Sequence, residues 1–234
     1  MLANLGGATV LERLVKRVSQ AKRPDVVVLA TTREPEDDEL TAAAEALGLS
    51  VFRGSTHDVL VRWRDAATAY DADLLVNCDG DDVFCDPPHI DRIIETYEQT
   101  GAEYIVCAGL PFGAAPTGIA ASGLERVCER KLEENTEGQG RFFAAPGIVS
   151  KAEVTAPPEL GHPTARMTLD YPEDLEFFSA VVSELESGDE PPSLEQIVAL
   201  LRARPDIVAI NSGVQERYWE RFNALYQPVQ LKSA

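Results

Sequence analysis

The sequence has no apolar run near the ~20 residues needed to cross a bilayer, so we expect no membrane-spanning segment. Residues 1–7 lack the basic start and the apolar centre of a signal peptide. The four cysteines include no Cys-x-x-Cys pair, which is typical of reduced thiols. Together these absences predict a cytoplasmic protein with no membrane partner.

Positive charge is also scarce in this chain. It has 21 Lys and Arg residues against 39 Asp and Glu residues, which gives a formal net charge of −18. Surfaces that follow nucleic-acid phosphates need a cationic field, so we expect no nucleic-acid partner. A nucleoside triphosphate would be repelled as well, and binding one would need a divalent cation and local arginines to offset the repulsion.

The hydrophobic pattern of the 234 residues indicates strands that alternate with helices to about residue 190. The β-branched run at residues 26–30 predicts a strand buried on both faces, and residues 10–18 place valines and leucines on one helical face. Further strands are expected at residues 50–53, 74–78, 103–107 and 166–169. Further helices are expected at residues 37–47, 57–70, 88–99, 124–132, 172–185, 194–202 and 215–225.

This alternation, with short connections, implies a parallel sheet with helices on both faces. We expect an α/β domain at residues 1–187 and a helical tail, residues 188–234, that packs on it. The aromatic residues of the last helix are expected to pack on the domain or to form a dimer contact. Residues 109–118 are expected to form a loop, and the irregular stretch 135–165 is the expected place for acceptor-binding or dimer-contact residues.

Acidic residues follow the expected strand at residues 74–78. They are Asp79, Asp81 and Asp82. In open α/β sheets, ligands bind at the carboxyl ends of the strands, and Mg²⁺ takes one or two carboxylates there together with water and phosphate oxygens. Asp170 likewise follows an apolar run and precedes a helix. We therefore predict that Asp81 and Asp170 hold Mg²⁺ together.

A second interpretation of these carboxylates is structural. Asp170 could cap the helix that follows it, since oxygen acceptors at a helix start bind free backbone N–H groups. For Glu173 and Asp174 we prefer this interpretation, because acidic residues in the first turn interact favourably with the helix dipole.

Several segments, in chain order, resemble the cytidylyltransferases that activate sugar acids, in particular the SpsF-like branch and the acylneuraminate cytidylyltransferases. They read LGGATVLER (5–13), VLATT (28–32), VFRGS (51–55), DVLVR (58–62), GDDVFCDP (80–87) and RMTLDYPEDL (166–175). The resemblance implies a three-layer α/β/α, Rossmann-like fold of the nucleotide-diphospho-sugar-transferase type. It gives Asp81 and Asp170 the positions of the family's magnesium-binding aspartates.

The same resemblance places a nucleotide near the strand at residues 50–53. We expect Arg53, Ser55, Asp58 and Asp79 to bind it, since an arginine fork can pair with phosphate or with base edges. Asp58 has an equal alternative as an acidic residue at a helix start.

The acceptor is expected near residues 136–143, a polar and aromatic segment that is similar to acceptor-side segments of some family members. Glu137 and Arg141 are the predicted substrate contacts, with a structural salt bridge in the loop as the alternative. The resemblance implies transfer of CMP from CTP to a sugar acid, with release of pyrophosphate, in surface-polysaccharide precursor synthesis. It also implies a homodimer.

Two other functions remain open at this point. Asp79-Gly80-Asp81 has the Asp-x-Asp pattern with which metal-dependent glycosyltransferases of the related GT-A fold hold a nucleotide sugar. The chain could also be a non-catalytic partner subunit. Family members begin with a strand and an Arg-rich glycine loop that binds the triphosphate, and this sequence starts after that loop. We expect Met1 to be an internal methionine taken as the start, and the chain as written to bind nucleotide poorly.

Overall fold

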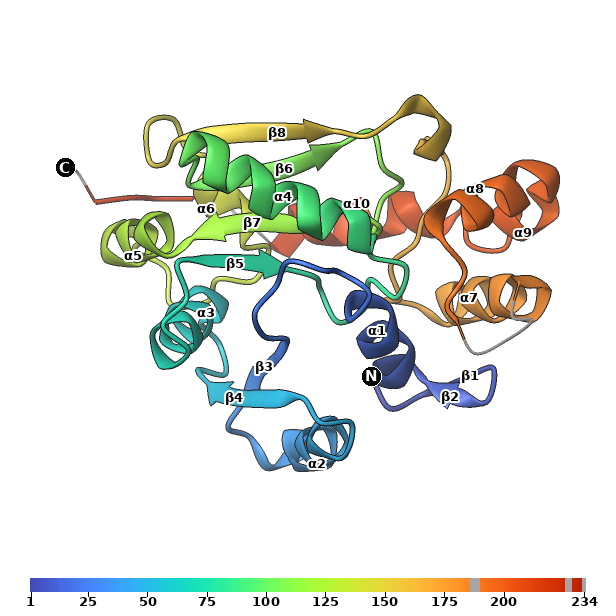
Figure 1. The fold of residues 1–234 in the computed structure, drawn as a ribbon, viewed down its shortest axis with the longest axis horizontal. Helices are drawn as coiled ribbons and strands as arrows, with labels where there is room; N and C mark the ends of the chain where they lie inside the picture. The colour runs from blue at the N-terminus through green and yellow to red at the C-terminus, as the bar shows by residue number, and fades with distance from the viewer. Residues whose placement is uncertain (186–189, 226–228, 233–234) are drawn as a thin grey trace.

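A computed structural model describes residues 1–185, 190–225 and 229–232 (Figure 1). In this part of the chain the strands are β1 (Asn4–Leu5), β2 (Ala8–Thr9), β3 (Val28–Thr32), β4 (Ser50–Gly54), β5 (Leu74–Asn77), β6 (Tyr104–Ala108), β7 (Thr117–Ala120) and β8 (Lys151–Thr155). The helices are α1 (Val10–Val18), α2 (Asp38–Ala46), α3 (Val59–Ala69), α4 (Pro87–Thr100), α5 (Ala121–Arg130), α6 (Gly140–Ala144), α7 (Pro172–Leu185), α8 (Leu194–Ala203), α9 (Pro205–Ala209) and α10 (Val214–Leu225), with short 3₁₀ turns η1 (Pro35–Asp37) and η2 (Pro158–Leu160).

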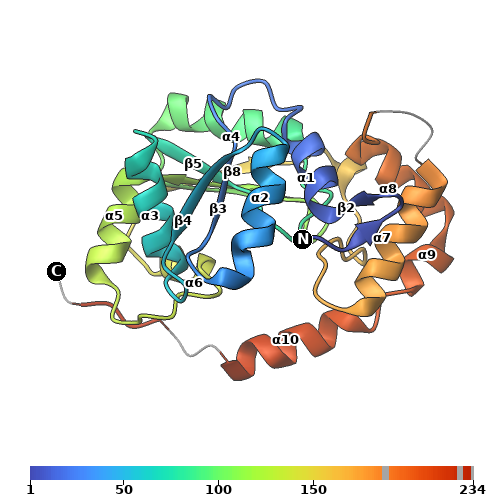
Figure 2. The same ribbon diagram turned by 90° about the horizontal axis from the view of Figure 1, so that it is seen from below.

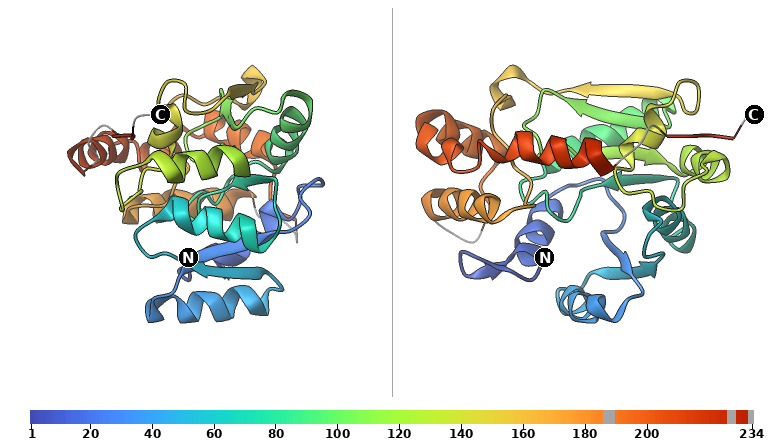
Figure 3. Two further views of the ribbon diagram at one scale, coloured as in Figure 1. Left: turned by 90° about the vertical axis from the view of Figure 1, so that its left-hand side faces the viewer. Right: turned by 180° about the vertical axis from the view of Figure 1, so that it is seen from behind.

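The central sheet has the strand order β5-β7-β6-β8 and carries helices on both faces. Helix α4 crosses one face, and Figure 3 shows α6 and α10 on the other. This is the expected three-layer α/β/α architecture. The expected boundary between residues 187 and 188 lies outside the described residues. No helix in the described part of the chain is both long and apolar enough to span a bilayer.

The expectation of an entirely parallel sheet was wrong at β7. This strand runs antiparallel to both β5 and β6, whereas β6 and β8 are parallel. Strand β7 begins inside the stretch 109–118, which was predicted to be a loop, and β8 and α6 lie inside the stretch predicted to be irregular. Small residues dominate β7, so sheet pairing rather than local propensity makes it a strand. The strand expected at residues 166–169 is reduced to one bridge between Phe112 and Arg166.

The strand expected at residues 26–30 is present as β3, but it is not buried on both faces. Its residues are mostly half-buried, and Val26 is 43% exposed. The reason is its pairing: β3 bonds to β4 alone and β5 bonds to β7 alone, so among the described residues no hydrogen bonds join the two sheets. Figure 1 shows the β3–β4 pair and α2 at the bottom of the view, below β5, and Figure 2, seen from below, shows them in front.

A hydrophobic core holds the segment that follows β5. Val83 and Phe84 come directly after the acidic residues and are buried in the same core as Phe177 and Phe178 of α7. The rings of Phe84 and Phe178 are 4.6 Å apart. Arg17, on the buried face of α1, donates its Nε–H to the carbonyl of Cys85 at 2.7 Å. The turn that carries Asp79, Asp81 and Asp82, here named the acidic turn, is therefore anchored at its carboxyl end by apolar burial and by a buried hydrogen bond.

Gly118 in the middle of β7 provides a test of the sheet packing. A Cβ at this position would lie 2.4 Å from Cγ2 of Ile93 in α4. We expect Gly118→Ala to lower the free energy of unfolding by about 1–3 kcal/mol, because it overpacks the contact between α4 and the sheet. Urea unfolding measures this. Gly213→Ala is the control, since a Cβ there meets no atom within 4 Å; equal stability of the two variants would contradict the packing.

Candidate active site

A cavity of about 740 Å³ opens at the carboxyl end of β5. It is lined by the acidic turn, by the connection between β6 and β7, by the loop before α6, by the segment before α7, and by α10. The lining residues that carry charge are Asp79, Asp81, Asp82, Glu137, Arg141, Asp170 and Arg221, and the aromatic ones include Trp63, Tyr104, Phe112, Phe143, Tyr218 and Phe222. One cavity thus combines aromatic surfaces with a wall of carboxylates, Asp79, Asp81, Asp82 and Asp170, here named the acidic wall.

The three aspartates of the turn carry perturbed carboxyl groups. Burial raises the pKa of Asp79, although Asn77 Nδ2 donates to its Oδ1 at 2.9 Å and opposes the shift. Burial and the charges of Asp79 and Asp170 raise the pKa of Asp81 to about 6. The pKa of Asp82 is raised well above its ordinary value, again chiefly by burial. Each of these carboxyl groups is half-buried and lies near other carboxylates, which is the electrostatic pattern of a cation site.

The structure brings Asp81 and Asp170 together, as the sequence predicted. The backbone N–H of Leu169 donates to the carbonyl of Asp81 at 3.0 Å, so the two segments run side by side. Both aspartates line the cavity, and the charge of Asp170 contributes to the raised pKa of Asp81.

The donor chemistry suits Mg²⁺ bound together with a phosphate. Among the described residues there is no group of three or more His, Cys, Asp or Glu side chains that could hold a metal on its own. Mg²⁺ commonly keeps several waters and takes one or two carboxylates plus phosphate oxygens, so the pair Asp81 and Asp170 is an adequate protein contribution. A cation there would offset the repulsion that raises the pKa of Asp81.

Glu137 and Arg141, the predicted acceptor contacts, also line the cavity. Arg141 donates from Nε to the carbonyl of Gly138 at 3.2 Å and from Nη2 to the carbonyl of Glu137 at 3.1 Å. Nearby, Gln139 Nε2 donates to Asp79 Oδ1 at 3.3 Å and connects this loop to the acidic turn. The loop therefore reaches the acidic wall of the cavity.

Arg53 and Ser55 lie apart from this group and are not among the residues that line the cavity. The guanidinium of Arg53 donates to the carbonyl of Thr32 at 2.9 Å and to Asp38 Oδ1 at 2.6 Å. It joins the ends of β3 and β4. Ser55 Oγ accepts the backbone N–H of Asp58 at 3.1 Å. Their role in nucleotide binding stays a prediction.

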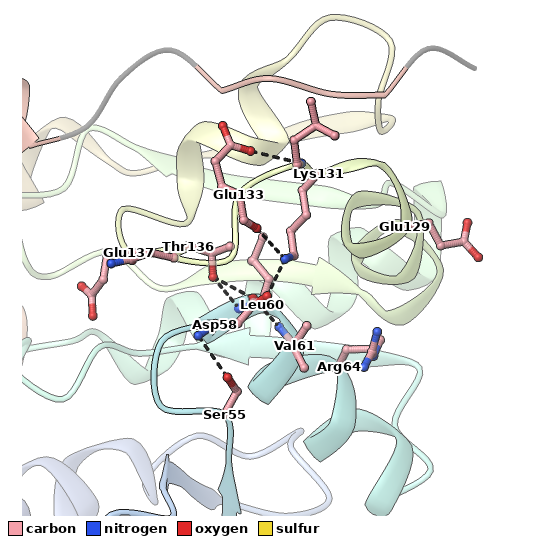
Figure 4. A network of polar contacts seen from close by, with 12 residues as sticks. Ser55, Asp58, Leu60, Val61, Arg64, Glu129, Lys131, Glu133, Thr136 and Glu137 are labelled. Atoms are coloured by element: carbon pink, nitrogen blue, oxygen red, sulfur yellow. Dashed lines mark hydrogen bonds and ion pairs between the residues drawn. The ribbon is translucent and has the colours of Figure 1, made fainter.

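Asp58 is the N-cap of α3, as its alternative interpretation expected, and it does not line the cavity (Figure 4). Its Oδ1 accepts the N–H of Val61 and the hydroxyl of Thr136, both at 3.0 Å. Its Oδ2 forms an ion pair with Lys131, and both side chains are largely buried. Because Thr136 directly precedes Glu137, this network fixes the start of the loop that lines the cavity.

The helix-start interpretation of Asp174 is confirmed. Its Oδ2 accepts the backbone N–H groups of Asp170 and Tyr171, each at 3.0 Å. The sequence analysis missed two parts of the site: Arg166, whose guanidinium binds Asp170, and the cavity-facing residues of α10. Arg166 lies four positions before Asp170 in a segment that the resemblance had already matched, and the dense aromatics of the last helix were the signal for α10.

Comparisons with known proteins point in one direction. A family model described as "Cytidylyltransferase" matches residues 1–143. The spore coat polysaccharide biosynthesis protein SpsF of Bacillus subtilis is 28% identical over 214 residues, 88% of each chain. A 3-deoxy-manno-octulosonate cytidylyltransferase from Anaeromyxobacter dehalogenans is 28% identical over 204 residues, 85% of this chain and 77% of the relative. The structure of a cytidylyltransferase from Leptospira borgpetersenii superposes with a TM-score of 0.79 at 24% identity, covering 88% of each chain.

The Asp58–Lys131 ion pair gives a stability prediction. Asp58→Ala should lower the free energy of unfolding by about 3 kcal/mol, because it removes a helix cap and leaves the ammonium of Lys131 buried without its carboxylate. Asp65→Ala is the matched control: its ion pair with Arg64 is partly exposed, with side chains 33% and 39% accessible, and should contribute less than about 1 kcal/mol. Similar losses for both variants in urea unfolding would argue against the buried network.

The raised pKa of Asp81 gives a pH-dependent prediction. Stability that comes from the neutral carboxyl is present at low pH and is lost as the pH rises through about 6. In the absence of divalent cations, Asp81→Asn should therefore be more stable than wild type by about 1–3 kcal/mol near pH 8, with a smaller difference near pH 4. Urea unfolding in EDTA at the two pH values measures this. Asp81→Asn that is no more stable near pH 8 would show that the carboxylate is not destabilising.

Proposed function

The chain belongs to the cytidylyltransferase family of nucleotidyltransferases, and from this we propose that it transfers CMP from CTP to an oxygen of a sugar acid and releases pyrophosphate. The observation that carries the proposal is the lining of one cavity by Asp81 and Asp170 from distant parts of the chain. The similarity to SpsF and to 3-deoxy-manno-octulosonate cytidylyltransferases supports a sugar-acid acceptor and a role in surface-polysaccharide precursor synthesis.

In the proposed reaction, an acceptor oxygen attacks the α-phosphorus of CTP in line. The new oxygen–phosphorus bond forms as the bond to the β-phosphate oxygen breaks, and pyrophosphate leaves. Asp81 and Asp170 would hold Mg²⁺, which when bound supplies charge neutralisation for the phosphate oxygens. The side chains of Asn77 and Gln139 hold Asp79 in place at the same wall.

The acceptor side of the cavity is proposed to include Glu137 and Arg141. Arg141 is held by the carbonyls of its own loop, so its guanidinium is already oriented before a substrate binds. The aromatic rings of Tyr104 and Phe143 stack at 4.9 Å in the lining and would exclude water from the reacting groups.

We also propose a cytoplasmic location and a homodimer formed through residues 109–165. The location is supported by the sequence, whose four cysteines include no Cys-x-x-Cys pair.

Substitution of the two aspartates tests the function. Asp81→Ala and Asp170→Ala should each lower Mg²⁺-dependent pyrophosphate release from CTP and a sugar acid by roughly 100-fold or more, because charge neutralisation at the phosphates is lost. A pyrophosphate assay with 3-deoxy-manno-octulosonate or N-acetylneuraminate as acceptor measures this. Glu220→Gln, on the exposed side of α10, is the control.

The alternatives give different results in the same assay. Activity retained in both aspartate variants would refute the assignment of the carboxylates. Release of a nucleoside diphosphate from a nucleotide sugar, without use of CTP, would identify a glycosyltransferase. Binding of CTP and Mg²⁺ with no turnover of any acceptor would favour a partner subunit.

A further inference from the structure

Arg166 is a buried arginine that the proposed mechanism does not use. Its side chain is 2% exposed, and each edge of its guanidinium meets a different part of the fold. Nε donates to Asp174 Oδ1 in α7 at 3.1 Å, and Nη1 donates to Gln215 Oε1 in α10 at 3.2 Å. Nη2 forms an ion pair with Asp170 Oδ2. The guanidinium of arginine is planar and its N–H donors point in fixed directions, which suits three acceptors placed around its edge.

Two aromatic rings cover the guanidinium as well. Cζ of Arg166 lies 4.8 Å from the ring centre of Tyr218 in α10 and 5.5 Å from that of Phe112. Cation–π contacts of this kind are stronger when the cation is desolvated, as it is here. Both rings line the cavity. Burial, and after it the charge of Asp170, raise the pKa of Tyr218 to about 12.

This cluster holds both the backbone and the side chain of Asp170. Asp174 fixes its backbone, because Asp174 Oδ2 accepts the N–H of Asp170. Arg166 fixes its side chain through Oδ2, whereas Oδ1 of Asp170 accepts no hydrogen bond among the described residues. One carboxylate oxygen is thus occupied by the arginine, and the other is available to a cation.

Helix α10 is attached to the body of the protein in part through the same cluster. All residues of α10 are described, and Val214 alone is buried. Beyond that residue, Gln215 and Tyr218 contact Arg166, and Trp219 packs on Phe112. A second attachment is independent of Arg166, because Arg217 pairs with Glu173 of α7 at 3.0 Å and lies over the ring of Tyr171. Figures 2 and 3 show α10 running along the outside of the molecule, away from α5 and α2.

We propose that Arg166 is a positioning residue that orients the carboxylate of Asp170 and fastens α10 over the cavity. The wall formed by Tyr218, Arg221 and Phe222 is then coupled to the acidic side chains, because Arg166 contacts both Asp170 and Tyr218. The proposed function enters only in the role of Asp170 as a ligand of Mg²⁺.

Hydrogen–deuterium exchange of the α10 backbone tests the coupling without a substrate or metal. Asp170→Ala removes a partner of Arg166 that forms no hydrogen bond or ion pair with α10 among the described residues, and should speed exchange in α10 by about fivefold or more. Glu220→Ala removes an exposed carboxylate from α10 itself and should leave exchange in the rest of the helix unchanged. Unchanged exchange in Asp170→Ala would overturn the proposal.

A double-substitution cycle shows whether the connection runs through Arg166. Tyr218→Leu and Arg166→Met should each speed α10 exchange by about tenfold, and the double variant should be no faster than the faster single variant by more than about twofold. Effects that multiply would overturn the proposal. If Arg166→Met does not fold, the pair Tyr218→Leu and Asp170→Ala gives the same cycle with the same criteria.

Titration with Mg²⁺ and CTP then separates this proposal from the proposed function. Tyr218→Leu should weaken the Mg²⁺ affinity by about fivefold in calorimetry, since Asp170 is less well held. The titration is made at a CTP concentration that saturates the protein, which must be high because the chain as written is expected to bind nucleotide poorly. Unchanged affinity in this variant would overturn the positioning role. A wild-type protein that binds no Mg²⁺ under any condition would contradict the proposed function, while the exchange cycle would still decide how α10 is fastened.

Discussion

Carboxylates held close together at the end of β5 impose the main electrostatic constraint on this protein. Asp79, Asp81 and Asp82 follow a single strand, and Asp170 meets them from the segment before α7. Their burial and mutual repulsion oppose folding when they are charged. Two features offset that cost. The core of α7, α8 and α9 buries the residues directly after the turn, and Arg166 supplies a positive charge on the Asp170 side. The four carboxylates are therefore kept in place by the residues around them and not by contacts with one another.

The parts of the site that the sequence predicted are those with a local signature. A run of apolar residues followed by aspartates marks a strand end wherever it occurs, and this placed Asp81 and Asp170 correctly at one cavity. Helix α1 also has a local signature, because Thr9 and Glu12 form a capping box at its start and its apolar residues lie on one face. Strand β7 had no such signature: Thr117–Ala120 is a strand because β5 and β6 pair with it from both sides. Strand β8, at the edge, alternates weakly and has a mostly exposed surface.

The contacts that the sequence did not predict are those between distant segments. Arg166 contacts Gln215 and Tyr218, which lie about fifty positions later in the chain. The residue spacing of neither segment predicts these contacts. Asp58 shows a related effect. Its motif suggested a ligand contact. Its side chain instead binds Lys131 and Thr136, which follow the end of α5 in the chain. In both cases a charged residue binds side chains from a distant part of the chain, and only the folded structure shows these partners.

The distribution of the cavity wall along the chain has a consequence for substitutions in α10. The family model ends at residue 143, yet α10 provides aromatic and cationic surface to the same cavity from beyond residue 213. Most residues of α10 are not buried, so a change at an outward-facing position should cost little stability. A change at a position that faces the cavity would instead alter the shape and charge of its wall while leaving the aspartates at the end of β5 in place.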